Sequence, residues 1–164
     1  MMLTFPNYPI VDKEIRIFDD TDLLPRNIGV VGSRRRNKLS DFKKVYKKLQ
    51  EIYRAGSGDI IVSGLCRKGA DYFALLIVKG YDLPHKWFPV DERKVDAAKG
   101  LDRKWAYARA AYDRNTDIAR NSDILIACVA SDRKGGTEDT IRKFLRFQKM
   151  KEKQAIALGK LILV

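Results

Sequence analysis

The residues best suited to chemistry in this sequence lie in three glycine-bearing segments, each of which follows an apolar run. The first segment is Gly32, Ser33 and Arg34, directly after the run 28–31 and followed by two more arginines. Glycine lets a backbone approach a ligand closely, a helix start offers unpaired N–H groups, and arginine adds charge. The pattern predicts a phosphate site, and a tight turn with a solvated basic cluster is the alternative.

The second segment has the same character and follows the apolar run 59–63. It contains Ser63, Gly64, Gly69 and Asp71. The two glycines could bring backbone amides to a ligand. Asp71 could accept a hydrogen bond from a ribose, or it could cap the helix that follows.

The third segment follows the run 123–128 and contains Gly135, Gly136 and Thr137. Two glycines and a hydroxyl residue at a helix start are suited to an anion held by amides. A plain glycine turn with Thr137 as the helix N-cap is the alternative. Three such segments make coincidence less plausible than any one of them alone.

Other polar residues are weaker candidates. Arg114 and Asn115 lie in the helix before the run 123–128, where Arg114 could reach the same phosphate or simply be solvated. We expect His85 to be structural, because no carboxylate or nucleophile is arranged around it. Cys66 and Cys128 lack metal-ligand spacing and are expected to be buried thiols, so we predict no metal site and no cofactor.

Short apolar runs alternate with stretches of helical periodicity from residue 27 onward. The predicted strands are 28–31, 59–63, 85–88, 123–128 and 160–164, and the predicted helices are 42–52 after a cap at Ser40, 72–79, 105–120 and 137–153. This pattern predicts an α/β fold of Rossmann type, a three-layer sandwich around a five-stranded, mainly parallel sheet in the order 3-2-1-4-5. Ligands in such sheets bind at the carboxyl ends of the strands, where the three segments would converge.

The composition agrees with one domain. The chain has 164 residues and a formal net charge of +12, which favours anionic partners such as phosphates or nucleic acid. It has neither a membrane-spanning apolar stretch nor a signal-peptide pattern, so we expect a soluble, cytoplasmic protein that does not bind membranes. Residues 1–26 do not fit the repeat and are predicted to be an N-terminal extension, in which 15–18 could add a peripheral strand; residues 27–164 are the predicted domain.

Taken in order, these segments resemble the SLOG superfamily, which includes the Lonely Guy phosphoribohydrolases and the DprA/Smf proteins. The similarity is to its YspA-like branch and covers residues 27 to about 144. It is carried by Gly32-Ser33-Arg34, Ser63-Gly64 with Gly69-Ala70-Asp71, Phe88-Pro89, Arg114-Asn115 and Gly135-Gly136-Thr137. The resemblance implies a Rossmann-like fold and a nucleotide-derived ligand, bound by a sensor or a nucleotide-processing protein.

The resemblance also implies where hydrolysis of a nucleoside monophosphate would occur. In Lonely Guy enzymes a glutamate in the third segment acts with an upstream arginine. Here Thr140 stands at the glutamate position, while Arg114 could match the arginine and Glu138 or Asp139 lies close by. Arg114, Glu138 and Asp139 are therefore the catalytic candidates if the protein is an enzyme.

Two classes of binding function stay open at this point, and a scaffold whose site is vestigial is a third alternative. Clustering of Arg34, Arg35, Arg67, Lys68, Arg133 and Lys134 at the strand ends would favour a nucleotide-like small molecule. A continuous stripe that includes Lys43, Lys44, Lys47 and Lys48 would favour a nucleic-acid-binding module. The family resemblance and Trp105, Tyr107 and Tyr112 on one helix also suggest a homo-oligomer, although these aromatic residues could equally belong to the core.

Overall fold

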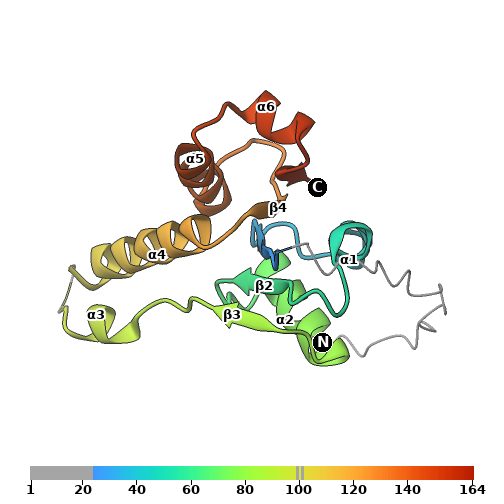
Figure 1. Cartoon of the computed structure of the whole chain (residues 1–164). Coiled ribbons are helices and arrows are strands. Elements are labelled where there is room, and N and C mark those ends of the chain that lie inside the picture. Colours follow the sequence, from blue (N-terminus) through green and yellow to red (C-terminus); the bar gives the residue numbers. More distant parts are fainter. Residues whose placement is uncertain (1–23, 99, 101) are drawn as a thin grey trace.

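Helices and strands alternate along the chain in the computed structural model, which describes residues 24–98, 100 and 102–164 (Figure 1). The strands are β1 Asn27–Gly32, β2 Ile60–Ser63, β3 His85–Trp87, β4 Ile124–Cys128 and β5 Leu161–Leu163. The helices are α1 Leu39–Ile52, α2 Ala70–Tyr81, α3 Glu92–Asp96, α4 Asp102–Arg120, α5 Gly136–Gln148 and α6 Glu152–Ala157. The α/β class expected from the sequence is confirmed. No described helix has both the length and the hydropathy needed to cross a membrane.

The five strands form one parallel sheet in the order β3-β2-β1-β4-β5. Gly29 of the central strand β1 lies opposite Val62 of β2 on one side and Leu125 of β4 on the other. The predicted strand order is therefore confirmed. Because the strands all run the same way, their carboxyl ends share one edge, and the order reverses between β1 and β4.

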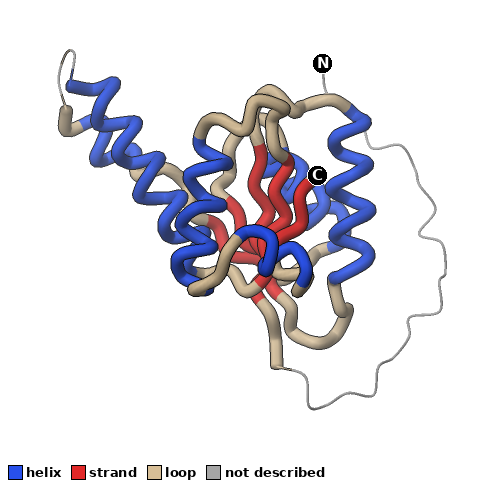
Figure 2. Tube along the Cα trace, turned by 90° about the horizontal axis from the view of Figure 1, so that it is seen from above, coloured by secondary structure: helices blue, strands red, loops and turns tan. Residues whose placement is uncertain are grey.

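Helices cover both faces of this sheet (Figure 2). Val30 of β1 packs with Phe73 of α2 in one buried cluster, whereas its neighbour Val31 packs with Phe144 of α5 in the other. Consecutive strand residues point to opposite faces, so a strand covered on both sides must be apolar throughout. This explains the continuous apolar runs and confirms the three-layer arrangement.

One part of the molecule extends beyond the sheet. The short helix α3 packs against α4, and together they project away from the other helices (Figures 1 and 2). Lys94 pairs with Asp113 at 3.1 Å, and Arg103 pairs with Asp96 at 3.0 Å. These ion pairs hold α3 on one side of α4, while Asn115 on another side of α4 is hydrogen-bonded to the start of α5. The sequence periodicity had not predicted α3.

The predicted strand limits differ from the structure by no more than one residue at either end, whereas the helix limits need correction. Helix α1 begins at Leu39 with Lys38 as N-cap, so the prediction of Ser40 as the cap is wrong. The Lys38 N–H donates to Asp41 Oδ2 at 3.1 Å, which satisfies the helix start from inside the first turn. Helix α2 passes Gly80 and ends at Tyr81, with Asp82 as its C-cap at a φ of 50°.

A single helix over 137–153 is also wrong. Helix α5 ends before Lys149, which has a φ of 51°, and α6 begins three residues later. The Met150 N–H then donates to Leu145 O at 3.2 Å, and Ala155 of α6 is fully buried against the sheet. Packing of α6 therefore overrides the helical periodicity of the segment.

The described chain begins inside the predicted N-terminal extension. The proposed strand at 15–18 lies outside the described residues. Arg26 is joined to the body of the domain, because its N–H and its guanidinium donate to Asp59 at 2.9 and 2.7 Å.

Candidate functional site

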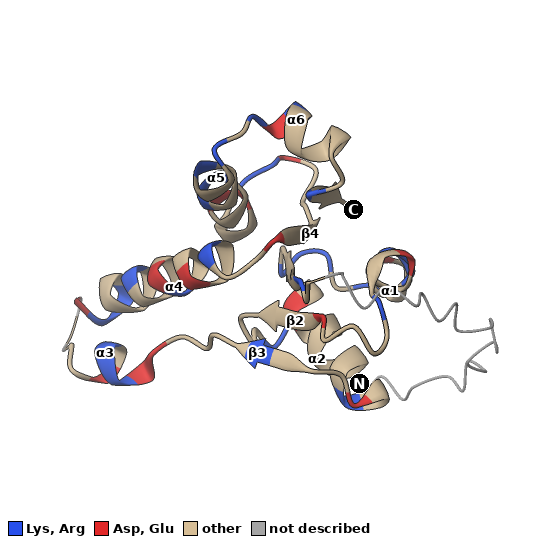
Figure 3. Ribbon diagram, in the orientation of Figure 1, with Lys and Arg blue, Asp and Glu red and all other residues tan. Residues whose placement is uncertain are grey.

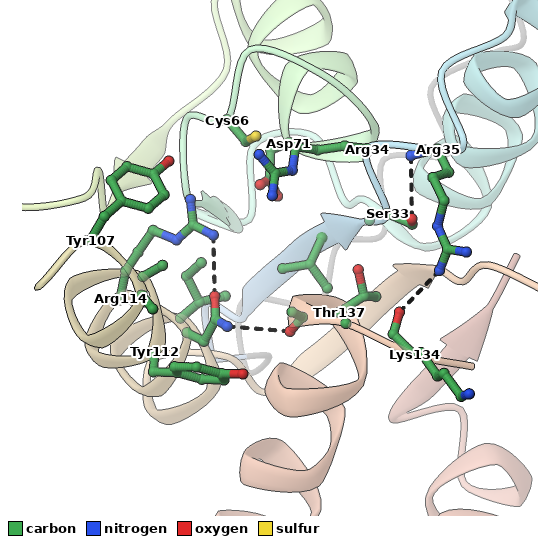
Figure 4. A pocket seen from close by; sticks show the side chains of 18 residues that line it. Ser33, Arg34, Arg35, Cys66, Asp71, Tyr107, Tyr112, Arg114, Lys134 and Thr137 are labelled. Carbon is green, nitrogen blue, oxygen red and sulfur yellow. Dashed lines mark hydrogen bonds between the residues drawn. The ribbon is translucent and has the colours of Figure 1, made fainter. Parts of the chain in front are cut away.

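A cavity of about 510 Å³ opens at the carboxyl edge of the sheet, beside the point where the strand order reverses (Figure 4). It is enclosed by the loops after β1, β2 and β4 and by one face of α4. The lining residues are Val31, Gly32, Ser33, Arg34, Arg35, Cys66, Asp71, Tyr107, Ala108, Ala111, Tyr112, Arg114, Asn115, Ile118, Lys134, Gly135, Gly136 and Thr137. Nine of the predicted ligand-binding residues are among them, namely Gly32, Ser33, Arg34, Asp71, Arg114, Asn115, Gly135, Gly136 and Thr137.

The loop after β1 is held close to β4 and α2. The Ser33 N–H donates to Cys128 O at 2.9 Å, and Ser33 Oγ accepts from the Arg35 N–H at 3.3 Å. A Cβ on Gly32 would lie 2.6 Å from the Cβ of Ala70, so only glycine fits where β1 passes the start of α2. Arg34 follows with an exposed side chain that makes no ion pair with any described residue.

Three predicted ligand residues after β2 do not line the cavity: Ser63, Gly64 and Gly69. Ser63 Oγ is buried, 2.7 Å from Val30 O and 3.2 Å from Asp71 Oδ1. Gly69 has a φ of 75°, and a Cβ there would lie 2.6 Å from Ser33 O. These residues position the neighbouring loops, which is a supporting role rather than the direct contact predicted.

Asp71 is the carboxylate that lines the cavity, and it is almost completely buried. Burial raises its pKa to about 6, although the charge of Arg114 and hydrogen bonds from Ser63 and the Cys66 backbone act in the opposite direction. It occupies the first turn of α2, whose N-cap is Gly69, so the alternative of Asp71 as the cap is wrong. A buried carboxyl group with a raised pKa therefore lines the cavity together with Arg34 and Arg114.

Arg114 crosses from α4 toward the loop after β2 (Figure 4). One terminal nitrogen, Nη1, lies 3.5 Å from Gly64 O, and Nη2 donates to Asn115 Oδ1 at 3.2 Å. Its Nε is buried without a hydrogen-bond partner among the described residues. A Cβ on Gly64 would lie 3.0 Å from the Arg114 side chain, so this glycine makes room for the arginine. Nε is therefore covered by Gly64, and the terminal nitrogens are the part of Arg114 that can meet a ligand in the cavity.

The start of α5 forms the wall beside Arg114. Gly135 is its N-cap with a φ of 108°, so the alternative of Thr137 as the N-cap is wrong. Asn115 Nδ2 donates to Gly136 O at 3.3 Å and to Asp139 Oδ2 at 3.2 Å, which ties α4 to this turn. The first N–H groups of a helix have no partner within it, so this end of α5 can receive an anion.

The two carboxylates proposed for catalysis do not line the cavity. Glu138 is paired with Arg133, whose Nη2 lies 3.0 Å from Glu138 Oε2. Asp139 is buried and accepts from Lys143 at 2.7 Å as well as from Asn115. Of the three catalytic candidates, only Arg114 is positioned at the cavity, and the catalytic roles gain no support from this geometry.

The cavity also contains residues that were not predicted as ligand contacts. Arg35 spans the mouth, donating to both carboxylate oxygens of Asp132 at 2.8 Å and to Lys134 O at 3.3 Å. Tyr107 and Tyr112 of α4 line it while remaining 48% and 51% exposed. Spacing on α4 could have indicated the tyrosines, since residues 107, 111, 114 and 118 share one helix face and 108, 112 and 115 lie on the adjoining one.

The remaining predictions concern the two cysteines, His85 and metal binding. Cys128 is buried as expected, whereas Cys66 is half-buried at the cavity wall. His85 is exposed on β3, with Nδ1 3.0 Å from Leu83 O. The described residues hold no group of three His, Cys, Asp or Glu side chains that could bind a metal ion.

Comparison with known proteins gives one informative similarity. No protein-family model matches the chain, and no curated protein sequence matches it. DNA processing protein A (DprA) from Helicobacter pylori, solved in a study of its single-stranded DNA binding, superposes with a TM-score of 0.55 at 15% sequence identity. The match covers 85% of this chain and 75% of that protein. The chain therefore has a Rossmann-like fold similar to that of DprA.

Proposed function

We propose that this protein binds a nucleotide through its phosphate in the cavity at the carboxyl edge of the sheet. The main supporting observation is Arg114, whose side chain lines the cavity and forms no ion pair with a described carboxylate. Its terminal nitrogens carry N–H groups beyond those directed at Gly64 and Asn115, and these can donate to an incoming acceptor. A phosphate or phosphodiester oxygen is such an acceptor.

The surroundings of Arg114 suit the rest of a nucleotide. Arg34 and Lys134 add positive charge without ion pairs to described residues, and the start of α5 adds backbone N–H groups. The volume of about 510 Å³ lies within the usual range for small-ligand sites. Tyr107 offers an aromatic ring for a base on the α4 side, and Tyr112, which has Lys143 over one face of its ring, lines the same wall. The resemblance to the YspA-like branch of the SLOG superfamily supports the same ligand class.

Binding can be tested by calorimetry with AMP, cyclic AMP and ADP-ribose. We expect Arg114→Ala or Arg34→Ala to weaken binding about tenfold to a hundredfold, because each removes a charge-assisted contact. Arg146→Ala, an exposed arginine outside the cavity, is the matched control and should leave the affinity unchanged. Equal affinities for all four proteins would place any nucleotide site elsewhere.

The enzymatic form of this proposal is hydrolysis of the N-glycosidic bond in a nucleoside monophosphate. We expect this reaction to be slow or absent, because Glu138 and Asp139 are engaged by Arg133 and Lys143 outside the cavity. Incubating purified protein with AMP and measuring free adenine tests this. Rapid release of adenine would contradict it, and Glu138→Gln and Asp139→Asn would then show whether either carboxylate acts after a rearrangement.

The second candidate function is binding of single-stranded nucleic acid. The specific observation in its favour is the fold similarity to DprA, whose solved structure concerns single-stranded DNA binding. The distribution of basic residues does not distinguish nucleotide binding from nucleic-acid binding. Arg34, Arg35 and Lys134 gather at the cavity, while Lys43, Lys44 and Lys47 are exposed on α1, which packs on the other side of the sheet.

A further inference from the structure

Helix α4 carries three aromatic side chains that the described chain covers only in part; Lys143 lies 5.3 Å from the ring centre of Tyr112. Trp105 is 68% exposed, and Tyr107 and Tyr112 are about half exposed. Aromatic side chains of this size are normally buried, and several exposed together mark an interaction surface. Trp105 and Tyr112, with Lys104 and Arg109, are called the α4 ridge below; Tyr107, two residues from Trp105, lies on another side of the helix.

Helical spacing places this ridge beside the cavity. Trp105 and Tyr112 are seven residues apart, so they lie on the same side of α4 and about 10 Å apart along its axis. Tyr112 and Tyr107 both line the cavity, whereas Trp105 does not. The ridge therefore continues the cavity wall outward along the part of α4 that projects beyond the sheet (Figure 1).

Helix α4 carries charged residues of both signs, some of them paired and some not. Figure 3 shows basic and acidic residues interspersed along the helix. Asp113 and Arg103 are paired with α3, on the far side from the cavity. Lys104 and Arg109 are exposed and form no ion pair with any described residue. Aromatic rings and unpaired cations thus occur together on the ridge.

We propose that the α4 ridge binds the bases and backbone of a single-stranded nucleic acid whose terminal nucleotide occupies the cavity. This inference rests on the second candidate function, binding of single-stranded nucleic acid, and identifies the surface that would bind it. Exposed rings stack on bases irrespective of sequence, and nearby cations contact the phosphates between them. A second copy of this chain could pack against the same apolar rings. Its own ridge cations would then lie close to those of the first copy and repel them.

Length dependence of binding tests this inference. Fluorescence anisotropy would compare oligothymidylates and oligouridylates of 2, 6 and 12 nucleotides with the mononucleotides as competitors. We expect the 12-mers to bind at least tenfold more tightly than the mononucleotides, and a duplex, whose bases are already stacked, to bind more weakly. The DNA and RNA series show which sugar the ridge accepts. Equal affinities for the 12-mers and the mononucleotides would overturn the inference.

The Trp105→Ala variant separates the ridge from the cavity. It should weaken binding of the 12-mer at least fivefold and leave mononucleotide binding within twofold of the wild type. Phe147→Ala, an exposed aromatic residue on α5 outside the cavity, is the matched control and should change neither affinity. If Trp105→Ala and Phe147→Ala bind the 12-mer alike, the ridge does not contact nucleic acid.

Two further measurements distinguish the remaining outcomes. Trp105→Phe keeps a stacking ring, so it should retain most of the affinity but lose the quenching of tryptophan fluorescence that we expect when the wild type binds. Sedimentation of the wild type and of Trp105→Ala detects self-association, and a dimer that Trp105→Ala dissociates would overturn the proposal. Mononucleotides could fail to bind while Trp105→Ala still weakens binding of the 12-mer. That result would overturn the proposed nucleotide function but support nucleic-acid binding by the ridge.

Discussion

Arg35 donates two hydrogen bonds of 2.8 Å to the carboxylate of Asp132, joining the loop after β1 to the loop after β4 across the mouth of the cavity. Each residue is exposed, and Asp132 neutralises a cation that would otherwise face an incoming anion. The pair therefore tunes the charge of the site more than it stabilises the fold.

Replacing Asp132 by asparagine should strengthen anion binding. We expect Asp132→Asn to lower the Kd for AMP two- to tenfold and to steepen its dependence on salt, because the charge of Arg35 becomes available. Titration at low and moderate salt measures both effects. Asp96→Asn breaks an exposed pair outside the cavity and should leave the affinity unchanged. Weaker binding by Asp132→Asn would show that the bridge orders the site.

Asp71 should make the stability of the fold depend on pH in a specific direction. Its folded pKa of about 6 lies above its ordinary value of 3.8, so the folded state holds the proton more tightly than the unfolded state. Its contribution to stability therefore falls as the pH rises from about 4 to about 6. Asp71→Asn removes this titration, so the variant should gain stability relative to the wild type over that interval. Urea denaturation at several pH values measures the difference, and a constant difference would exclude the effect.

Asp59 should act in the opposite direction. Burial alone would raise its pKa, but hydrogen bonds from Arg54 and Arg26 outweigh burial and hold the pKa well below its usual range. Its contribution to stability is complete above the unfolded pKa and is lost as the pH falls toward the folded value. We expect Asp59→Asn to lower the free energy of unfolding by about 2–4 kcal/mol at pH 7, with a smaller loss at pH 3. A loss that is equal at both values would argue against the ion pairs.

Gly69 should tolerate alanine poorly. Its φ is 75°, and the added Cβ would meet the Ser33 carbonyl oxygen at 2.6 Å. Gly56 has nearly the same φ, 78°, but nothing lies within 4 Å of the position of its Cβ. Gly56→Ala therefore measures the backbone strain alone, about 1 kcal/mol, and Gly69→Ala should cost about 1–3 kcal/mol more in urea denaturation. An equal loss of unfolding free energy in the two variants would mean that the loop containing Ser33 moves away from the added Cβ without cost.

Gly136 should behave differently, because the site rather than the fold requires it. An added Cβ would lie 3.5 Å from Asn115 Nδ2, which is an ordinary contact. We expect Gly136→Ala to melt within about 2 °C of the wild type, whereas Gly136→Val should abolish AMP binding because its side chain occupies the space of the phosphate. Unchanged affinity in Gly136→Val would exclude the start of α5 from the phosphate site.

The sequence by itself determined the sheet and the loops that follow its strands. Apolar runs such as 123–128 and turns such as Gly135-Gly136 are local signals, and the right-handed crossover rule then leaves few strand orders. Since parallel strands share a carboxyl edge, local signals were enough to bring Gly32, Arg114 and Gly136 to one cavity.

Only the tertiary structure decided what each side chain does at that edge. Gly64 makes room for Arg114, fifty positions away in the chain, and Glu138 turns to Arg133 instead of the cavity. Helix α3 packs on one side of α4, and Trp105 on another side stays exposed. This exposure depends on packing between helices, so it could not be predicted from the sequence of α4 alone. Periodicity identifies which residues share a face, but contacts between distant elements decide whether that face is buried, paired or left open to a ligand.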